Sequence, residues 1–137
     1  MSASPPGHNP LKILIVEDHR DARTTMRMLL SMAYGHTVYE AADGASGVRS
    51  AVETHPDIAL IDLGLPDIDG HEVARRIRAA LDGKIVLIAL TGYGSAEDQR
   101  RTEEAGFDLH LVKPVDASEL VRIFEDVVRA RAAARET

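Results

Sequence analysis

Apolar residues gather in short continuous runs along the chain, and the longest runs predict strands that are buried on both faces. These runs cover residues 11–16, 58–61 and 85–90. Continuous apolar runs of this length are typical of the inner strands of a parallel sheet. Residues 37–41 and 107–112 mix polar and apolar positions more evenly, so we predict edge strands there.

Between these strands, apolar residues recur every three or four positions, which is the pattern of an amphipathic helix. The stripes consist of Ala22, Met26, Leu29, Leu30 and Ala33; of Val73, Ala74, Ile77 and Leu81; and of Leu120, Ile123, Phe124, Val127 and Val128. Residues 95–105 are mostly charged or carry amides, so we expect a largely solvated helix there. Gly35, Gly83 and Gly106 stand where helices are expected to end.

Five strands that alternate with five helices predict a single α/β domain with a doubly wound parallel sheet. Right-handed crossovers, three inner strands and two edge strands favour the strand order 2-1-3-4-5, the flavodoxin-like arrangement. We expect this domain to cover residues 11–130. Residues 1–10 contain three prolines and a glycine and are expected to form a disordered tail. Residues 131–137 should prolong the last helix or fray.

The composition fits one ordinary globular domain, with 137 residues, 45% of them hydrophobic and 28% charged. The absence of cysteine excludes disulfides, thiolate metal sites and cysteine catalysis. A formal net charge of −6 argues against direct binding of nucleic acid. No run approaches the ~18 apolar residues of a membrane span, so we expect no membrane insertion and a cytoplasmic location.

Polar side chains follow four of the predicted strands at the point where each strand ends. Glu17 and Asp18 follow the first strand, Asp62 the third, Thr91 the fourth and Lys113 the fifth. The carboxyl ends of parallel strands meet at one edge of the sheet, where ligands bind in open α/β folds. The sequence therefore predicts one polar site at this edge.

This set of side chains suits phosphoryl transfer. Three carboxylates repel one another unless a cation lies between them, and Mg²⁺ prefers oxygen ligands. Asp62 is a competent nucleophile, Lys113 offers a positive charge to phosphoryl oxygens, and Thr91 offers a hydroxyl donor. Each residue taken alone has a structural interpretation, because an aspartate at a strand end usually caps a helix or a turn. The combination favours a phosphoryl-transfer site.

Four motifs resemble those of the response-regulator receiver domains, the family of the chemotaxis regulator CheY. They are Ile-Val-Glu-Asp at 15–18, Ile-Asp-Leu-Gly-Leu-Pro-Asp-Ile-Asp-Gly at 61–70, Leu-Thr-Gly at 90–92 and Val-Lys-Pro at 112–114. The resemblance covers residues 11 to 129, nearly the whole chain. Each motif alone is weak, whereas the four together are highly specific.

The resemblance implies a role for each matching residue of the acidic site. Asp62 corresponds to the phosphoacceptor of the family, and Glu17 and Asp18 to the acidic pair that organises Mg²⁺. Asp18 is expected to be a direct ligand, whereas Glu17, which stands where Asp is commoner, is expected to act through water. Gly64 corresponds to the position whose backbone carbonyl completes the metal site.

The resemblance also implies a switch. Thr91 corresponds to the hydroxyl that follows the phosphoryl group, and Lys113 to the phosphate-binding lysine, whose bond to Pro114 is expected to be cis. His110 occupies the place of the tyrosine or phenylalanine that rotates with the threonine, so we expect it to be the switch side chain. The remaining histidines that we assessed show no convergent spacing and are interpreted as surface or loop residues rather than ligands; they are His19, His36, His55 and His71.

Three functions follow as hypotheses. The first is a regulator that is phosphorylated by a sensor histidine kinase or a histidine phosphotransfer protein and binds a downstream protein through its fourth helix, fifth strand and fifth helix. The second is a phosphorelay shuttle or a receiver cut from a hybrid sensor kinase. The third is a phosphatase with an aspartyl nucleophile, but the haloacid-dehalogenase type has a second aspartate where this chain has Gly64. We therefore expect a regulatory phosphoacceptor rather than an enzyme.

Overall fold

Five parallel strands form one sheet in the computed structural model, which describes residues 10–33, 35–81, 84–92 and 96–136. The strands are β1 (Lys12–Val16), β2 (Thr37–Ala41), β3 (Ile58–Asp62), β4 (Val86–Thr91) and β5 (Leu109–Val112). Their order in the sheet is β2-β1-β3-β4-β5, which confirms the predicted topology.

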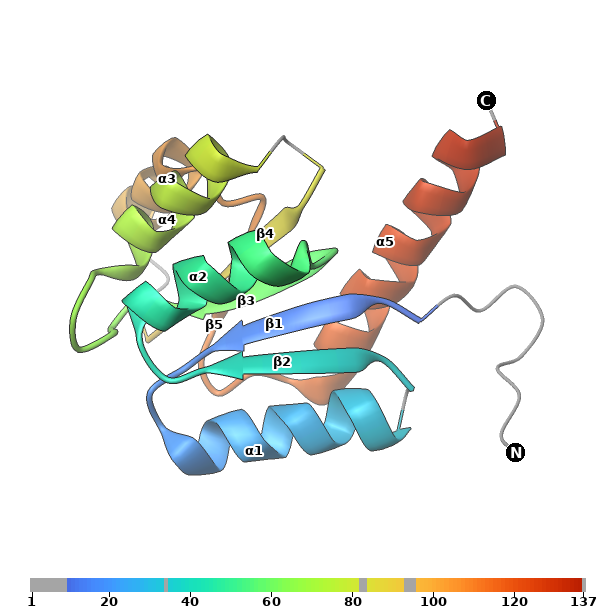
Figure 1. Ribbon diagram of the computed structural model, residues 1–137, viewed down its shortest axis with the longest axis horizontal. Helices are drawn as coiled ribbons and strands as arrows, with labels where there is room; N and C mark the ends of the chain where they lie inside the picture. The colour runs from blue at the N-terminus through green and yellow to red at the C-terminus, as the bar shows by residue number, and fades with distance from the viewer. Residues whose placement is uncertain (1–9, 34, 82–83, 93–95, 137) are drawn as a thin grey trace.

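Helices cover both faces of this sheet (Figure 1). They are α1 (Arg20–Met28), α2 (Gly44–Thr54), α3 (Gly70–Ala80), α4 (Ala96–Ala105) and α5 (Ala117–Glu136). A short π-helical segment, Leu29–Ala33, follows α1. In Figure 1, α2, α3 and α4 lie on one side of the sheet, and α1 and α5 lie on the other.

The alternation of side chains along the inner strands divides the core into two layers. In β1, Leu14 and Val16 join the layer beneath α2 and α3, whereas Ile13 and Ile15 join the layer beneath α1 and α5. All five residues of β3 are buried, as the continuous apolar pattern predicted. Buried central strands hold their carboxyl ends in fixed positions, which is what a site at that edge requires.

The predicted boundaries differ from the structure mainly around the fifth strand. β5 begins at Leu109 rather than Phe107, because the Phe107 N–H bonds to the Thr102 carbonyl oxygen (3.1 Å) and continues the turn that ends α4. Gly35 and Gly106 have φ angles of 71° and 103°, the left-handed conformation that favours glycine after a helix. Gly83 and the expected N-terminal tail up to residue 9 lie outside the described residues.

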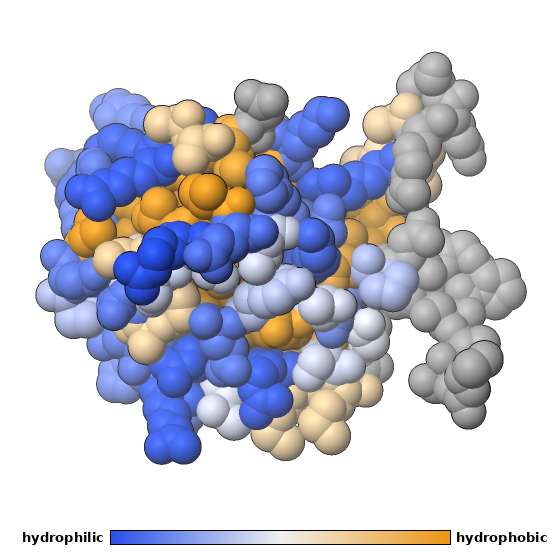
Figure 2. Space-filling view, viewed as in Figure 1, coloured by the Kyte–Doolittle hydropathy of each residue, from blue (hydrophilic) through white to orange (hydrophobic). Residues whose placement is uncertain are grey.

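In the part of the chain that the structure describes, no helix is long and apolar enough to cross a membrane. Figure 2 shows mainly hydrophilic side chains on one face of the molecule, with apolar side chains exposed between them in the region of α2 and α3.

Candidate functional site

Five polar side chains predicted from the sequence stand at the carboxyl end of the sheet. Glu17 and Asp18 directly follow β1, Asp62 and Thr91 are the last residues of β3 and β4, and Lys113 follows β5. Glu17, Asp62 and Thr91 are buried, whereas Asp18 is exposed and Lys113 is half-buried. The strand register therefore collects polar groups from four strands at one edge, with Asp18 as the most accessible carboxylate.

Lys113 joins two of the carboxylates. Its Nζ lies 3.0 Å from Glu17 Oε1 and 3.0 Å from Asp62 Oδ2. Burial lowers the pKa of Lys113, but the hydrogen bonds to Asp62 and Glu17 raise it overall, so the ammonium group stays charged. A fixed positive charge beside Asp62 suits a site that receives a phosphoryl group.

The two buried carboxyl groups have pKa values that move in opposite directions. Burial and the hydrogen bond with Asp62 raise the pKa of Glu17 to about 7. Burial also raises the pKa of Asp62, but hydrogen bonds with Glu17, with the Gly64 N–H and with Lys113 lower it overall. Of the two carboxyl groups, Glu17 therefore takes up a proton more readily as the pH falls, and Asp62 is the one that stays ionised and can act as a nucleophile.

Glu17, Asp18 and Asp62 also form a cluster that suits a divalent cation. Each offers a carboxylate oxygen, and these oxygens lie within 4.8 Å of one another. The Gly64 N–H donates to Asp62 Oδ1 (3.0 Å), which orients that carboxylate and brings the backbone of Gly64 beside the cluster. Oxygen ligands with few carboxylates are the donor set that Mg²⁺ takes in phosphoryl-transfer sites, so these residues fit the expected ion.

The backbone around the site is tied together by Lys113 and Thr91. The Lys113 N–H donates to the Thr91 carbonyl oxygen (2.7 Å), and the bond from Lys113 to Pro114 is cis. Thr91 and Lys113 thus stand on neighbouring strand ends, with the Lys113 side chain reaching Asp62 at the end of β3.

Gly70 supports the site in a way that sequence reasoning missed, although it closes the quoted motif at 61–70. Its N–H donates to the Leu63 carbonyl oxygen (3.2 Å). A Cβ at this position would lie 2.6 Å from the Asp62 carbonyl oxygen and 2.7 Å from Leu63 Cα, both backbone atoms. Glycine is therefore required for α3 to begin directly against the end of β3, a close approach that only the fold reveals.

Asp67 was likewise given no role from the sequence. Its carboxylate accepts hydrogen bonds from the backbone N–H groups of Gly44 (2.7 Å) and Ala45 (3.0 Å) at the start of α2. The loop after β3 is thereby fastened to the neighbouring helix. Asp67 stands three residues before α3 in the sequence, and nothing at that position predicts a contact with the start of α2, more than 20 residues earlier in the chain.

His110 belongs to β5, is half-buried and directs its ring toward α4. Its Nδ1 is 3.5 Å from Thr102 Oγ1, and it lines a cavity of about 170 Å³ together with Phe107 and Gln99. Its Nε2 is one of two buried side-chain polar atoms without a hydrogen-bond partner among the described residues. The ring therefore faces α4, beside a small empty space.

The interpretation of the other histidines as surface or loop residues is wrong for His71, whereas His36 does lie in the loop before β2 but is not at the surface. His36 is buried, because its Nδ1 accepts from the Leu11 N–H (3.0 Å) and its ring meets the edge of Phe124. His71 is buried at the start of α3, with its Nδ1 3.0 Å from Asp69 Oδ1. His19 and His55 are exposed, as expected.

Comparison with known proteins identifies the family. The model of the response regulator receiver domain matches residues 13–125. The transcriptional regulatory protein PrrA of Mycobacterium leprae is 34% identical over 89% of this chain, and the chain spans about half (52%) of the length of that relative. Sporulation initiation phosphotransferase F of Bacillus subtilis is 30% identical over 80% of this chain and 86% of its own length.

Solved structures agree. A CheY-like receiver domain protein from Methanospirillum hungatei superimposes with a TM-score of 0.83 at 26% identity, over 92% of this chain and 99% of that chain. The receiver domain of a sensor histidine kinase from Pseudomonas aeruginosa, which holds a magnesium ion in its active-site cleft, gives a TM-score of 0.78 at 34% identity, over 88% and 98% of the two chains. The chain therefore belongs to the response regulator receiver domains of two-component signalling.

Proposed function

We propose that Asp62 accepts a phosphoryl group from a sensor histidine kinase or a histidine phosphotransfer protein, in a reaction that depends on Mg²⁺. The observation that supports this most directly is the position of Lys113, whose Nζ lies 3.0 Å from both Asp62 and Glu17. A buried, ionised nucleophile beside a fixed positive charge and an acidic cluster is the arrangement that phosphoryl transfer needs.

The chemistry divides among the residues of the site. An oxygen of Asp62 attacks phosphorus, the bond from phosphorus to the donor histidine nitrogen breaks, and its electron pair returns to the imidazole. Lys113 and the Thr91 hydroxyl donate hydrogen bonds to the phosphoryl oxygens. Asp18, Asp62 and the Gly64 carbonyl would hold Mg²⁺, with Glu17 acting through water. When bound, the ion neutralises the charge that gathers on the phosphoryl oxygens.

The phosphoryl group then switches protein–protein interactions in the cytoplasm. Thr91 moves toward the phosphoryl group, and the ring of His110 fills the space that is vacated. The face formed by α4, β5 and α5 binds the downstream protein. A net charge of −6 supports a protein partner rather than nucleic acid for this domain.

Labelling with acetyl phosphate and Mg²⁺ tests the phosphoacceptor. Intact-mass spectrometry should show one added phosphoryl group on the wild-type chain and none on Asp62→Asn. Asp126→Asn is the matched control, because it makes the same change at an exposed position of α5 and should label normally. Equal labelling of Asp62→Asn and wild type would contradict the proposal.

A phosphorelay role, as a shuttle or as part of a hybrid kinase, is the second candidate. Two relatives favour it by name, the sporulation initiation phosphotransferase and the receiver domain of a sensor histidine kinase. Transfer of the phosphoryl group from Asp62 back to the histidine of a phosphotransfer protein would distinguish this role. Beyond its own phosphorylation and dephosphorylation we propose no enzymatic activity, and steady turnover of a small phosphoester would overturn that statement.

A further inference from the structure

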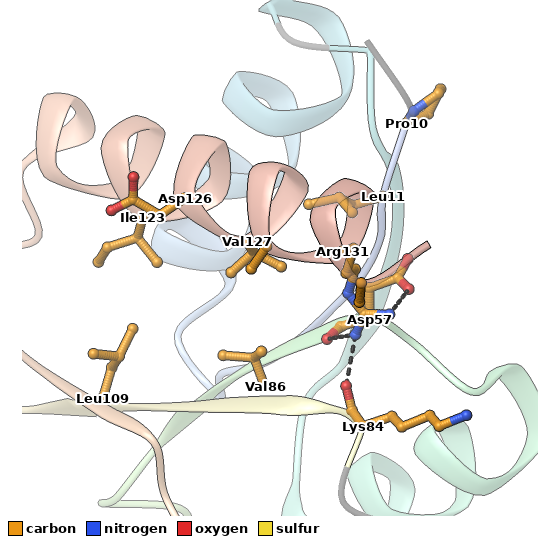
Figure 3. A pocket seen from close by; sticks show the side chains of 12 residues that line it. Pro10, Leu11, Asp57, Lys84, Val86, Leu109, Ile123, Asp126, Val127 and Arg131 are labelled. Carbon is orange, nitrogen blue, oxygen red and sulfur yellow. Dashed lines mark hydrogen bonds and ion pairs between the residues drawn. The ribbon is translucent and has the colours of Figure 1, made fainter. Parts of the chain in front are cut away.

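An apolar groove crosses the amino ends of the strands beside α5, at the opposite end of the sheet from Asp62 (Figure 3). Its volume is about 1040 Å³. Figure 3 shows Ile123 and Val127 of α5 pointing toward Val86 and Leu109 of the sheet across the opening. Leu109 is 41% exposed, so apolar surface remains open to solvent here.

The groove runs across the sheet from β1 to the edge strand β5. The residues that line its sheet side stand at the starts of four strands: Leu11 before β1, Asp57 before β3, Val86 in β4 and Leu109 in β5. These strands are neighbours in the order β1-β3-β4-β5, and three steps between strands of about 4.8 Å make a span of about 14 Å. The groove therefore has the length of a short extended segment.

The chain itself reaches this groove at one end. Pro10 and Leu11 both line it, and Figure 3 shows Pro10 on the side of Arg131 rather than on the side of Leu109. Residues 1–9 lie outside the described part of the structure and are joined to the fold at this point. A short covalent link holds such a segment beside the groove at an effective concentration of roughly millimolar, so even weak docking is populated.

The composition of residues 1–9 suits an apolar groove. The segment Met-Ser-Ala-Ser-Pro-Pro-Gly-His-Asn contains no aspartate, glutamate, lysine or arginine, and prolines stand at positions 5 and 6. The φ angle of proline is fixed, so a segment with adjacent prolines loses little conformational entropy when it lies extended on an apolar surface. Extended proline-rich segments are a recurring ligand of apolar grooves on proteins.

The charged side chains of the groove do not require a charged occupant. Arg131 Nη1 lies 3.2 Å from Asp57 Oδ1, and Asp126 Oδ1 lies 2.6 Å from Arg129 Nη2. Figure 3 shows the ammonium group of Lys84 pointing away from the centre of the groove. The surface left for an occupant is aliphatic, which favours an uncharged segment over the charged surface of another protein.

We propose that residues 1–9 of this chain lie along the groove, with Pro5 and Pro6 packed against Ile123 and Leu109. In the extended conformation of proline-rich segments, at about 3.1 Å per residue, five residues span about 15 Å. This length matches the distance across the groove from β1 to β5. The two prolines therefore reach the exposed leucine, which is the part of the groove most in need of cover.

The docked segment controls access to the base of the last helix. β5 and α5 belong to the face proposed above to bind the downstream protein, and the segment covers the part of that face that includes Leu109. A partner that uses this part has to displace the segment, whereas a partner that binds closer to α4 does not. Asp62 stays accessible, because it lies at the carboxyl end of the strands.

Paramagnetic relaxation in the full chain tests the contact, because no native cysteine competes for a nitroxide label. A label on Ser4→Cys should broaden the amide signal of Ile123 and leave the signals of α2, on the other side of the sheet, unchanged. In the labelled chain, Leu109→Glu should remove most of the broadening, because it places a charge in the apolar groove. Val112→Glu is the matched control, since Val112 is also exposed on β5 but does not line the groove, and it should leave the broadening intact.

Disulfide formation in dilute protein tests the position of the segment. Ser4→Cys combined with Leu109→Cys should close an intramolecular disulfide faster than Ser4→Cys combined with Val112→Cys. The two loops have nearly the same length, so a difference in rate reports docking rather than loop closure. Asp62→Asn should change neither the broadening nor the rates, so this proposal and the phosphoacceptor proposal fail separately.

Three results would overturn the proposed docking. The first is equal rates of disulfide closure for the two cysteine pairs. The second is broadening at Ile123 that persists in Leu109→Glu, which would mean that the segment is near the groove only because it is attached there. The third is broadening of an isotope-labelled chain by a nitroxide on a second chain, which would assign the groove to another copy.

Discussion

Arg78 of α3 and Arg131 of α5 bind adjacent carbonyl oxygens from opposite faces of the sheet. Arg78 Nη1 donates to the carbonyl oxygen of Ile85 (2.7 Å), and Arg131 Nη2 donates to that of Lys84 (2.6 Å). The two helices are thereby fastened to the same point, immediately before β4 begins. Arginine side chains thus bind the backbone at the amino ends of the strands, whereas Lys113 joins the carboxylates at their carboxyl ends.

Each arginine also meets an aspartate that stands just before a strand. Arg131 pairs with Asp57 and Arg78 with Asp108. Asp57 Oδ2 accepts from the backbone N–H of Lys12 (2.8 Å), and Asp108 Oδ2 accepts from that of Leu87 (2.8 Å). At the amino ends of the strands, each aspartate side chain therefore accepts a hydrogen bond from a backbone N–H of the neighbouring strand and adds to the bonds between the strands.

Arg78→Met should destabilise the fold measurably. Arg78 is only partly exposed and bonds to two carbonyl oxygens and Asp108, so its loss should lower the free energy of unfolding by about 1–3 kcal/mol. Arg76→Met on the same helix removes only exposed contacts with Glu72 and should cost less than about 1 kcal/mol. Urea unfolding of both variants measures the difference, and equal costs would contradict the role of Arg78.

Gly70→Ala should damage both the fold and the site, whereas Gly64→Ala should be tolerated. An added Cβ at Gly70 meets backbone atoms of Asp62 and Leu63 at 2.6 and 2.7 Å, but one at Gly64 meets Asp62 Oδ1 at 3.8 Å, an ordinary contact. The proposed metal ligand at Gly64 is a backbone carbonyl, which alanine retains. Melting temperature and acetyl phosphate labelling report both effects. Loss of labelling in a stably folded Gly64→Ala variant would count against this interpretation.

Mg²⁺ should stabilise the native chain, and Asp18→Ala should remove most of that effect. An ion that binds only the folded state at ten times its dissociation constant adds about 1.4 kcal/mol to the free energy of unfolding. Asp18 is exposed, so its replacement leaves the core intact. Thermal melts of both proteins with added Mg²⁺, compared with melts in EDTA as the metal-free reference, measure the shift in melting temperature. An undiminished shift in Asp18→Ala would exclude Asp18 as a major ligand.

Asp67 should contribute stability that disappears in acid. The backbone N–H groups of Gly44 and Ala45 lower the pKa of Asp67 to about 2, from an ordinary value of 3.8. The folded state therefore prefers the ionised form, so the contribution is complete above about pH 4 and is lost as the pH falls through 2. Urea unfolding should show that Asp67→Asn is less stable than wild type at pH 6 and that the gap narrows between pH 4 and 2. A gap independent of pH would refute this assignment.

His110→Ala should leave labelling of Asp62 nearly intact while weakening the response of α4. The His110 ring lies beside Thr102 and a cavity of about 170 Å³, so it links β5 to the helix. Amide chemical shifts of residues 96–105 should change on phosphorylation of the wild type and change less in His110→Ala. His110→Phe is the control, because it retains a ring of similar volume. Equal shift changes in all three proteins would remove His110 from the switch.

The order of strands followed from sequence because the apolar runs of inner strands differ from those of edge strands. The edge position of β5 was predicted correctly, but its start was not, because the backbone bond from Phe107 to Thr102 belongs to the end of α4. The acidic site was predictable for a similar reason. A parallel fold brings strand ends together, so residues that are distant in sequence could be grouped by topology alone.

The sequence could not reveal contacts that depend on how close two segments approach. Gly70 gave no hint that a methyl group would collide with the backbone of Asp62. The burial of His36 and His71 was not predicted, because burial of a histidine depends on partners far along the chain, which are Leu11 and Phe124 for His36. Such distances arise only when helices are placed on the sheet.

The ion pair between Lys113 and Glu17 joins residues 96 positions apart, one after the first strand and one after the last. Neither half of the chain contains the complete reactive centre. A chain in which the last strand has not yet joined the sheet would lack the positive charge of Lys113 beside Asp62. Labelling by a small phosphoryl donor should therefore also report the native population, and a substitution far from the site should reduce labelling only where it unfolds a large part of the protein.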